Sequence, residues 1–380
     1  MLDQEDDYRI CVIAKTENLS VDERLNKSYR CIHKNFATKL LLNYHDNDQK
    51  LSKLSGNIKC IGIKLFTRNI FKPGKFLIIK AFEFFIQIKF NTRKTDFLWI
   101  HEEWPFLCCL FGKKDKFIWD LHETPTRFLK QPYKKIFQII ERKAKFIVHA
   151  NEFRIDYLIK MSLVQSPEKH VALSNYPNRE NLPTKNKPKK YCDFKNWLKD
   201  SKYAYIQGVN KKDRFPVESI SAILEASEEK VCVVGAVEEE VKLYLTKKYG
   251  KIILTRVFFV GRIEACYIPL FLSDAMYSIV LYDDKDINNK LCAPNRFYHA
   301  LSLGVPVITG LNPPLKTVID KFENGIIIAG YGESINSIKT GIISLLNNYN
   351  EIKSNAKNHS DRFLWDEDSM ATFIKNLIQK

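Results

Sequence analysis

A repeated alternation of short apolar runs with amphipathic helical patterns constrains the fold of this chain more than any other feature. Helical patterns, such as those at residues 133–143 and 152–161, lie between the apolar runs. This alternation favours a parallel sheet with crossover helices, in which ligands gather at the carboxyl ends of the strands. The runs typical of buried strands are residues 9–14, 39–43, 58–65, 96–101, 117–121, 146–150, 170–173, 203–207, 230–234, 257–260, 278–282, 305–309 and 325–328.

A polar, basic and proline-containing stretch at residues 178–190 interrupts the alternation and is the best candidate for a linker. At 380 residues the chain is long enough for two domains. We therefore predict an α/β protein with an N-terminal Rossmann-like domain over residues 1–180, a linker over 181–200 and a C-terminal Rossmann-like domain over 201–358. The two parallel sheets are expected to face a central cleft, and residues 359–380 to form a C-terminal helix.

The chain is strongly basic, with a formal net charge of +16. Such a charge indicates a negatively charged partner: nucleic acid, an anionic membrane surface or a phosphorylated small molecule. Nucleic acid is not expected, because the sequence has no helix-turn-helix signature, zinc-ligand spacing or aromatic RNA-binding motif. A basic nucleic-acid-binding protein remains the alternative from another functional class.

Nine scattered cysteines without a Cys-x-x-Cys pair are typical of reduced cytoplasmic thiols. The N-terminus is acidic and polar, unlike a secretory signal, and no run of about 18 uncharged apolar residues predicts a spanning helix. We expect a cytoplasmic protein, either free or peripheral on the inner face of the plasma membrane.

Residues 293–309, APNRFYHALSLGVPVIT, are the most informative segment for function. Pro294 is suited to a helix start and Gly304 to a helix end, and an apolar strand follows. The N-terminus of such a helix offers free N–H groups and a positive dipole, to which Asn295 and Arg296 add donors. The segment therefore predicts a phosphate site; the alternative is an ordinary αβ unit.

The same segment resembles the donor-sugar signature of GT-B fold glycosyltransferases, especially those of glycosyltransferase family 4 (group 1 glycosyltransferases). The two-domain layout extends the resemblance over most of the chain, with the best detail at residues 116–176 and 257–328. Residues 362–378 resemble the family's C-terminal helix, which crosses back onto the N-terminal domain. The resemblance implies that the C-terminal domain binds a nucleotide-sugar donor and the N-terminal domain an acceptor.

Several donor-binding residues are implied by this resemblance. A glycine turn followed by basic residues contacts the donor diphosphate in the family, and a later glycine turn lies near the nucleobase. Arg can grip phosphate oxygens in a bidentate way, whereas Lys acts as a point charge. The positions in this chain are Gly208, Lys211, Lys212, Arg214, Gly261, Arg262, Pro294, Asn295, Arg296 and His299.

The chain departs from the family at His299, where the family usually has a Glu that binds the donor ribose. The paired Glu, eight residues earlier, corresponds to Leu291. Both acids are therefore replaced, which leaves the identity of the nucleotide open.

Polar, titratable side chains close two predicted strands of the N-terminal domain. Residues 120–123 read DLHE, and we predict His122 as the catalytic residue, with Asp120 and Glu123 as support or as an alternative base. In the family a similar loop faces the transferred sugar. Glu102 and Glu103, after the preceding strand, are candidates for binding an acceptor sugar. For each loop the alternative is a solvated turn.

No metal site and no cofactor are expected, because no Asp-x-Asp is placed convincingly for Mg²⁺, and residues 283–286 have the character of a solvated acidic loop. Basic residues after the first strand of the C-terminal domain, together with Arg296, are expected to stabilise a leaving nucleoside diphosphate instead.

Residues 51–100 contain ten Lys or Arg and two acids, a local net charge of +8. Within them, residues 72–90 mix Lys with Phe and Ile. This stretch is suited to lie on an anionic membrane surface, with its lysines extended toward the headgroups. A buried crossover helix with a basic outer face accounts for it equally well.

Taken together, these features predict a metal-independent, hexosyltransferase-like glycosyltransferase that transfers a sugar from a nucleotide donor to a glycan or lipid-linked acceptor in surface polysaccharide synthesis. Within the same fold, the alternatives are a nucleotide-sugar epimerase and a catalytically degenerate protein that binds without turnover.

Overall fold

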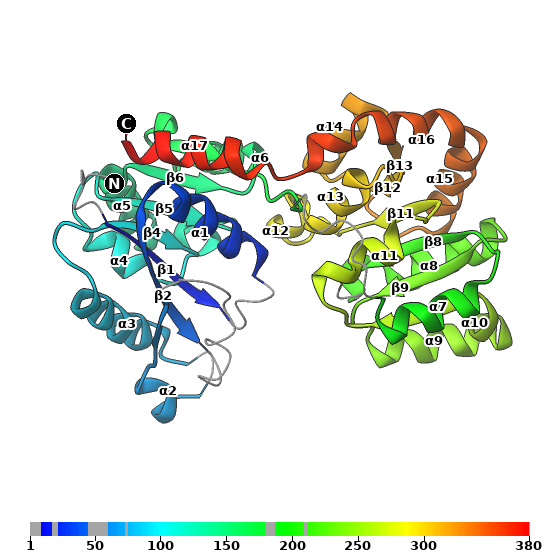
Figure 1. The fold of residues 1–380 in the computed structure, drawn as a ribbon, viewed down its shortest axis with the longest axis horizontal. Helices are drawn as coiled ribbons and strands as arrows, with labels where there is room; N and C mark the ends of the chain where they lie inside the picture. Colours follow the sequence, from blue (N-terminus) through cyan, green and yellow to red (C-terminus); the bar gives the residue numbers. More distant parts are fainter. Residues whose placement is uncertain are drawn as a thin grey trace, which may run out of the picture. The chain divides into compact units, whose positions relative to one another are not determined.

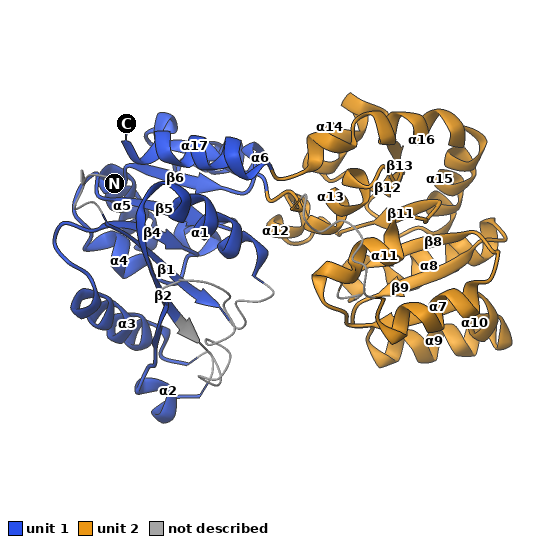
Figure 2. Cartoon of the chain, viewed as in Figure 1, with its two compact units in different colours: residues 1–174, 366–380 blue, residues 175–365 orange. Residues whose placement is uncertain are grey.

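The computed structural model describes residues 9–16, 22–44, 60–72, 75–178, 187–208 and 211–379. The chain divides into two compact units (Figures 1 and 2). Unit 1 contains residues 1–174 and 366–380, and unit 2 contains residues 175–365. The C-terminal end of the chain therefore returns to the unit in which the chain begins.

Unit 1 is built on a seven-stranded sheet in the order β3-β2-β1-β4-β5-β6-β7, and every neighbouring pair is parallel. Apolar side chains of β1, β4 and β5 are almost completely buried, as expected for strands covered on both faces. The strands are β1 (Arg9–Thr16), β2 (Ala37–Tyr44), β3 (Cys60–Ile63), β4 (Phe97–His101), β5 (Phe117–Leu121), β6 (Phe146–His149) and β7 (His170–Ala172).

Helices connect these strands, and the C-terminal helix completes the unit. They are α1 (Glu23–Asn35), α2 (Thr67–Ile70), α3 (Leu77–Asn91), α4 (Phe106–Leu110), α5 (Tyr133–Lys143), α6 (Glu152–Lys160) and α17 (Glu367–Gln379). Helix α17 packs on α1, where the Asn35 side chain donates a hydrogen bond to the carbonyl of Ala371 over 3.2 Å. Its buried face contains Ile374, Leu377 and Ile378, three of the apolar residues that the sequence places on one helical face.

Unit 2 is built on a six-stranded sheet in the order β10-β9-β8-β11-β12-β13, again with parallel neighbours. The two parallel sheets confirm the predicted fold class. The strands are β8 (Tyr203–Gln207), β9 (Lys230–Val234), β10 (Val257–Gly261), β11 (Tyr277–Val280), β12 (Val307–Thr309) and β13 (Gly325–Ile327).

The helices of unit 2 include one that the sequence analysis missed. Helix α7 (Lys189–Leu198) occupies much of the predicted linker and buries Tyr191, Phe194 and Leu198. An aromatic and apolar face of this kind belongs to a packed helix, so this part of the linker prediction was wrong. The others are α8 (Pro216–Ala226), α9 (Glu239–Tyr249), α10 (Lys251–Arg256), α11 (Ile268–Leu272), α12 (Ile287–Lys290), α13 (Asn295–Ser302), α14 (Pro313–Phe322), α15 (Ile335–Asn347) and α16 (Tyr349–Asn358).

The segment at residues 293–309 folds as predicted. Pro294 is the N-cap of α13, with an extended backbone (φ −79°, ψ 146°). Gly304 follows the helix with φ +64°, and a Cβ there would lie 2.9 Å from Cγ of Lys357. The chain then enters β12, whose side chains are all buried. Glycine is therefore required at this turn both for its backbone conformation and for the close approach of Lys357.

Candidate active site

Each sheet has one point at which the strand order reverses, and several of the candidate residues lie near it. In unit 1 the reversal lies between β1 and β4, and in unit 2 between β8 and β11. At such a point the connections leave on opposite faces, and a crevice opens at the carboxyl ends of the two strands. The sites of the two units are described separately.

In unit 1, parallel pairing brings two strand ends together. His101 ends β4 and pairs in register with Asp120 of β5. Arg24, on the helix that follows β1, forms an ion pair with Asp120 over 2.6 Å, and both side chains are buried. The indole of Trp99 donates to the other carboxylate oxygen over 3.3 Å. Asp120 is thus a fixed negative charge within the fold.

His122 lies just beyond β5 and is bound through both ring nitrogens. Its Nδ1 lies 2.7 Å from the carboxylate of Glu102, and its Nε2 lies 2.9 Å from Nδ1 of His101. The imidazole keeps 16% of its surface exposed, whereas His101 and Asp120 have none. His122 is therefore the histidine of this cluster that solvent or a ligand can reach, beside the carboxylate of Glu102, which is 37% exposed.

The charges around His122 shift its protonation. Burial lowers its pKa, but Glu102 and Asp120 outweigh that effect, and the pKa of His122 is raised above its ordinary value. Burial lowers the pKa of the neighbouring His101 to about 3, so that ring is neutral. The pair therefore consists of a neutral buried imidazole and a partly exposed imidazole that favours its cationic form.

The backbone also holds the His122 loop in position. Glu102 lies in the left-handed region (φ +72°), which is strained for a side chain of this kind and is often associated with functional sites. Arg154 donates to the carbonyl of His122. The two remaining predicted acids lie outside this network: Glu103 is 3.5 Å from Arg127, and Glu123 is exposed.

Three potential metal ligands, one each from His101, Asp120 and His122, lie within 4.8 Å of one another. Most of the potential ligand atoms of these three residues already have hydrogen-bond partners. Arg24 and Trp99 donate to the carboxylate, and the two imidazoles share a hydrogen bond. Among the described residues, Nε2 of His101 is buried and has no hydrogen-bond partner, so the network leaves one imidazole nitrogen unbonded.

In unit 2, two guanidinium groups lie close to one aromatic ring after β11. The guanidinium carbon of Arg296 is 4.3 Å from the ring centroid of Tyr282, and that of Arg214 is 5.2 Å from it. Gly208, at the end of β8, has φ +112°, and a Cβ there would lie 3.5 Å from a terminal nitrogen of Arg214 and 3.6 Å from Cδ of Arg296. The glycine thus leaves space beside both cations.

Arg296 also binds across the reversal point of the sheet. Its two terminal nitrogens donate to the carbonyls of Gln207 and Leu281, each over 2.8 Å. Burial lowers the pKa of Arg296, although nearby Tyr282 opposes the shift. The sequence predicts that Arg296 contacts phosphate directly. In the structure the Arg296 side chain instead holds the ends of β8 and β11 together through these two hydrogen bonds.

His299 lies one turn further along α13. It is buried, and its Nδ1 is 3.2 Å from the side-chain amide of Gln207. Leu291, the other position where the family has an acid, is also buried. The structure therefore joins His299 to the strand end that Arg296 anchors, and places an apolar side chain at the second position.

The remaining candidates of unit 2 differ in their surroundings. Lys211 and Lys212 line a hollow that also contains residues 238–240, all glutamates, and Lys212 lies 3.9 Å from Glu240. Gly261 has φ +73°, and Arg262 is exposed, with its carbonyl accepting from Lys190. Pro294 and Asn295 open α13 beside Arg296.

Several residues of these two networks were not predicted: Arg24, Trp99, Arg154, Gln207, Tyr282 and, as part of a site, His101. Arg24 lies 96 positions from Asp120 in the sequence, so only the folded sheet reveals the pair. For His101 a signal was present, because a polar residue at the carboxyl end of a buried strand is unusual. Tyr282 likewise follows a buried strand.

No family model matches the sequence, and the comparison with curated proteins found no match. Solved structures do match. HepE of Anabaena, in complex with UDP, has a TM-score of 0.69 at 11% identity, over 98% of this chain and 99% of that chain. Sucrose-phosphate synthase of Thermosynechococcus elongatus has a TM-score of 0.70 at 13% identity, over 98% of both chains.

A glycosyltransferase of Rickettsia africae has a TM-score of 0.68 at 13% identity, over 99% of this chain and 98% of that chain. At these identities the likeness establishes the fold. It agrees with two parallel sheets, each with one reversal of strand order. The chain has the fold of these structures, which confirms the GT-B fold predicted from its sequence.

Proposed function

We propose that the protein is a glycosyltransferase that moves a sugar from a nucleoside diphosphate donor to a glycan or lipid-linked acceptor. The observation that carries this proposal is the pair of guanidinium groups of Arg214 and Arg296 beside Gly208, next to the N-terminus of α13. A backbone turn without a side chain, two cations and a helix N-terminus form a suitable environment for a diphosphate.

These groups would stabilise the negative charge that develops on the leaving nucleoside diphosphate. Arg214 is the expected direct contact, because one of its terminal nitrogens borders the space left by Gly208, where a Cβ would lie 3.5 Å from it. Structures of HepE have been solved with UDP and with UDP-glucose. UDP-glucose is therefore the first donor to test, although His299 replaces the family's ribose-binding acid.

His122 is proposed as the residue of unit 1 that contacts the transferred sugar. Its raised pKa favours the cationic ring, which donates hydrogen bonds through both nitrogens and is a poor base. Because Glu102 and His101 already occupy its two ring nitrogens, we assign His122 to holding a sugar hydroxyl in place of one of these two contacts. Glu102 and Asp120 would act through His122, as positioning residues that keep its charge and orientation.

An anionic membrane surface is proposed as a further partner, through α3. This helix buries Ala81, Phe84 and Ile88 in the core of unit 1. Its other side exposes large apolar residues, among them Ile78, Phe82 and Phe90, which are 59%, 51% and 86% exposed. An exposed apolar stripe of this kind beside basic residues suits the interfacial region of a bilayer.

The structure corrects one detail of the membrane prediction. Lys80 is buried and donates to the carbonyls of Phe71 and Lys72, so it cannot extend toward lipid headgroups. No helix in the described part of the chain has the length and apolar character needed to cross a bilayer. A peripheral contact on the cytoplasmic face, with a lipid-linked acceptor of surface polysaccharide synthesis, is the arrangement we propose.

A turnover assay with UDP-glucose tests the proposed chemistry. With a lipid-linked or glycan acceptor, the protein should release UDP, and Arg214→Gln should lower the rate about 100-fold, as is typical when a donor to a developing charge is lost. Lys251→Gln, an exposed lysine elsewhere in unit 2, should leave the rate unchanged.

Two results would count against transfer. Conversion of the donor sugar without any acceptor would support an epimerase of the same fold. Donor binding without turnover, over a broad panel of acceptors, would support a protein that binds but does not catalyse.

A further inference from the structure

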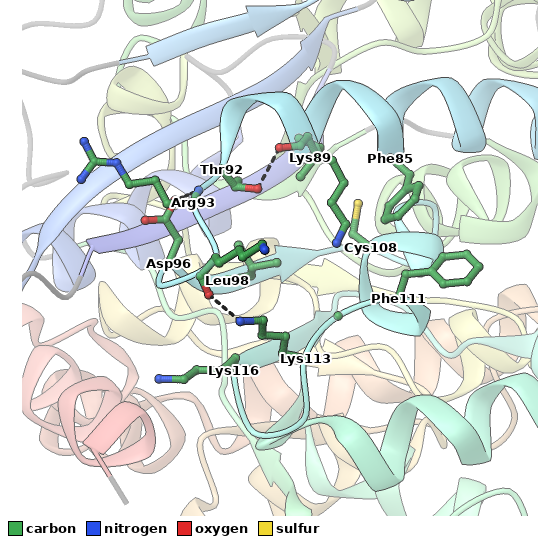
Figure 3. Close-up of a pocket in the computed structure, with 13 residues that line it drawn as sticks. Phe85, Lys89, Thr92, Arg93, Asp96, Leu98, Cys108, Phe111, Lys113 and Lys116 are labelled. Atoms are coloured by element: carbon green, nitrogen blue, oxygen red, sulfur yellow. Dashed lines mark hydrogen bonds between the residues drawn. The ribbon is translucent and has the colours of Figure 1, made fainter.

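A hollow of about 320 Å³ in unit 1 lies apart from the candidate active site. Its walls come from the C-terminal half of α3, the start of β4, and the segment between α4 and β5 (Figure 3). It lies at the amino ends of β4 and β5, whereas His101 and Asp120 are at their carboxyl ends. A ligand here would therefore occupy the opposite edge of the sheet from His122.

The hollow is lined by five basic residues, Lys89, Arg93, Lys94, Lys113 and Lys116, and by one acid, Asp96. The charge of Asp96 is already balanced, because Arg9 forms an ion pair with it over 2.6 Å and the backbone N–H of Arg93 donates a hydrogen bond to it. Figure 3 shows Lys89 pointing from α3 toward Cys108, with Lys113 and Lys116 on the loop opposite. This arrangement favours an anion within the hollow.

The other part of the lining is apolar and extends from the hollow to the exposed surface of α3. The ring centroid of Phe85 lies 5.1 Å from the ring centroid of Phe111 and 6.4 Å from that of Phe82. Phe82 belongs to the exposed apolar stripe of α3, and Phe111 is itself 52% exposed. A continuous row of aromatic rings thus joins the cationic hollow to the helix face proposed to contact a membrane.

We infer that this hollow binds the headgroup of an anionic phospholipid, with the start of an acyl chain along Phe85 and Phe111. The cations match a phosphate, the aromatic row matches a hydrocarbon chain, and the volume is at the lower end of the usual range for ligand sites. The inference deepens the proposed membrane contact of α3 and rests on it for the source of the lipid.

The test uses dihexanoyl phosphatidylglycerol below its critical micelle concentration, so that binding requires no bilayer and no sugar transfer. Dihexanoyl phosphatidylcholine controls for the chains, and inorganic phosphate for the anion alone. Calorimetry on the intact chain should show saturable binding of phosphatidylglycerol. Lys89→Gln combined with Lys113→Gln should weaken it roughly 30-fold, since each basic group near a lipid phosphate contributes about 1 kcal/mol and about 1.4 kcal/mol is a factor of ten.

Lys135→Gln combined with Lys160→Gln, which removes two exposed charges elsewhere in unit 1, should bind as the parent does. Three results would overturn the inference: equal affinity for the two lipids, equal affinity of the two double variants, or phosphate alone binding as tightly as phosphatidylglycerol. Because neither a donor nor vesicles are present, none of these results bears on the transferase proposal.

Discussion

At the residue scale, the central finding is that several candidate side chains are bonded to one another or to residues that were not predicted. Asp120 was predicted as a supporting group from its place at a strand end, and in the structure it holds Arg24, Trp99 and, at longer range, both histidines. The sequence could place Asp120 and His122 near a ligand because strand ends are recognisable. It could not show their partners, which come from a helix and a strand far away in the chain.

The charge of His122 can be tested by removing its closest acid. Glu102→Gln should lower the pKa of His122, because the carboxylate 2.7 Å away is a main cause of its elevation. Because the pKa of His122 is raised in the folded protein, its charged ring adds to the free energy of unfolding. This contribution is fully present below about pH 6.5, the usual pKa of histidine, and is lost as the pH rises through the pKa of His122 in the folded protein. The measurement is an NMR titration of the His122 ring.

Glu123→Gln is the matched control, since Glu123 is exposed and follows the same strand. It should leave the titration of His122 nearly unchanged. An unaltered pKa in Glu102→Gln would show that Glu102 does not hold the charge of His122.

At the element scale, the sequence predicted most strands and several helices, because buried strands and amphipathic helices have different apolar periods. Helix α5 has the bounds read from the sequence, and α13 ends at the expected glycine. The missed helix α7 lies in a stretch whose prolines and lysines resemble a linker, although its three buried apolar residues obey a helical spacing. Helix α3 has one buried face and one exposed apolar face, so its contact with a membrane stays a prediction.

The exposed face of α3 can be tested on vesicles. Ile78→Ser with Phe82→Ser should weaken co-sedimentation with phosphatidylglycerol vesicles at least about tenfold, because burying such side chains contributes roughly 1 kcal/mol or more each. Leu243→Ser with Leu254→Ser is the control in unit 2, where both leucines are similarly exposed. Equal losses in the two double variants, or none in either, would exclude α3 as the contact.

At the scale of the whole molecule, the chain builds two parallel sheets of similar design and places its unusual polar residues where each strand order reverses. In unit 1 these residues form a buried network with one accessible imidazole, and in unit 2 they form a pair of cations around Tyr282. The fold class was predictable from the sequence because short apolar runs alternating with amphipathic helical patterns indicate parallel sheets with crossover helices. The nucleotide was not, since the two acids that would bind its ribose are replaced by Leu291 and His299.

The most direct test of the account is calorimetric titration of the intact protein with UDP. We predict saturable binding to a single site, weakened about tenfold or more in Arg214→Gln through loss of a charge-assisted contact, and unchanged in Lys251→Gln. No binding of UDP or any other nucleoside diphosphate, or equal affinity in Arg214→Gln and the parent protein, would contradict the proposal that unit 2 holds a sugar donor at Gly208, Arg214 and Arg296.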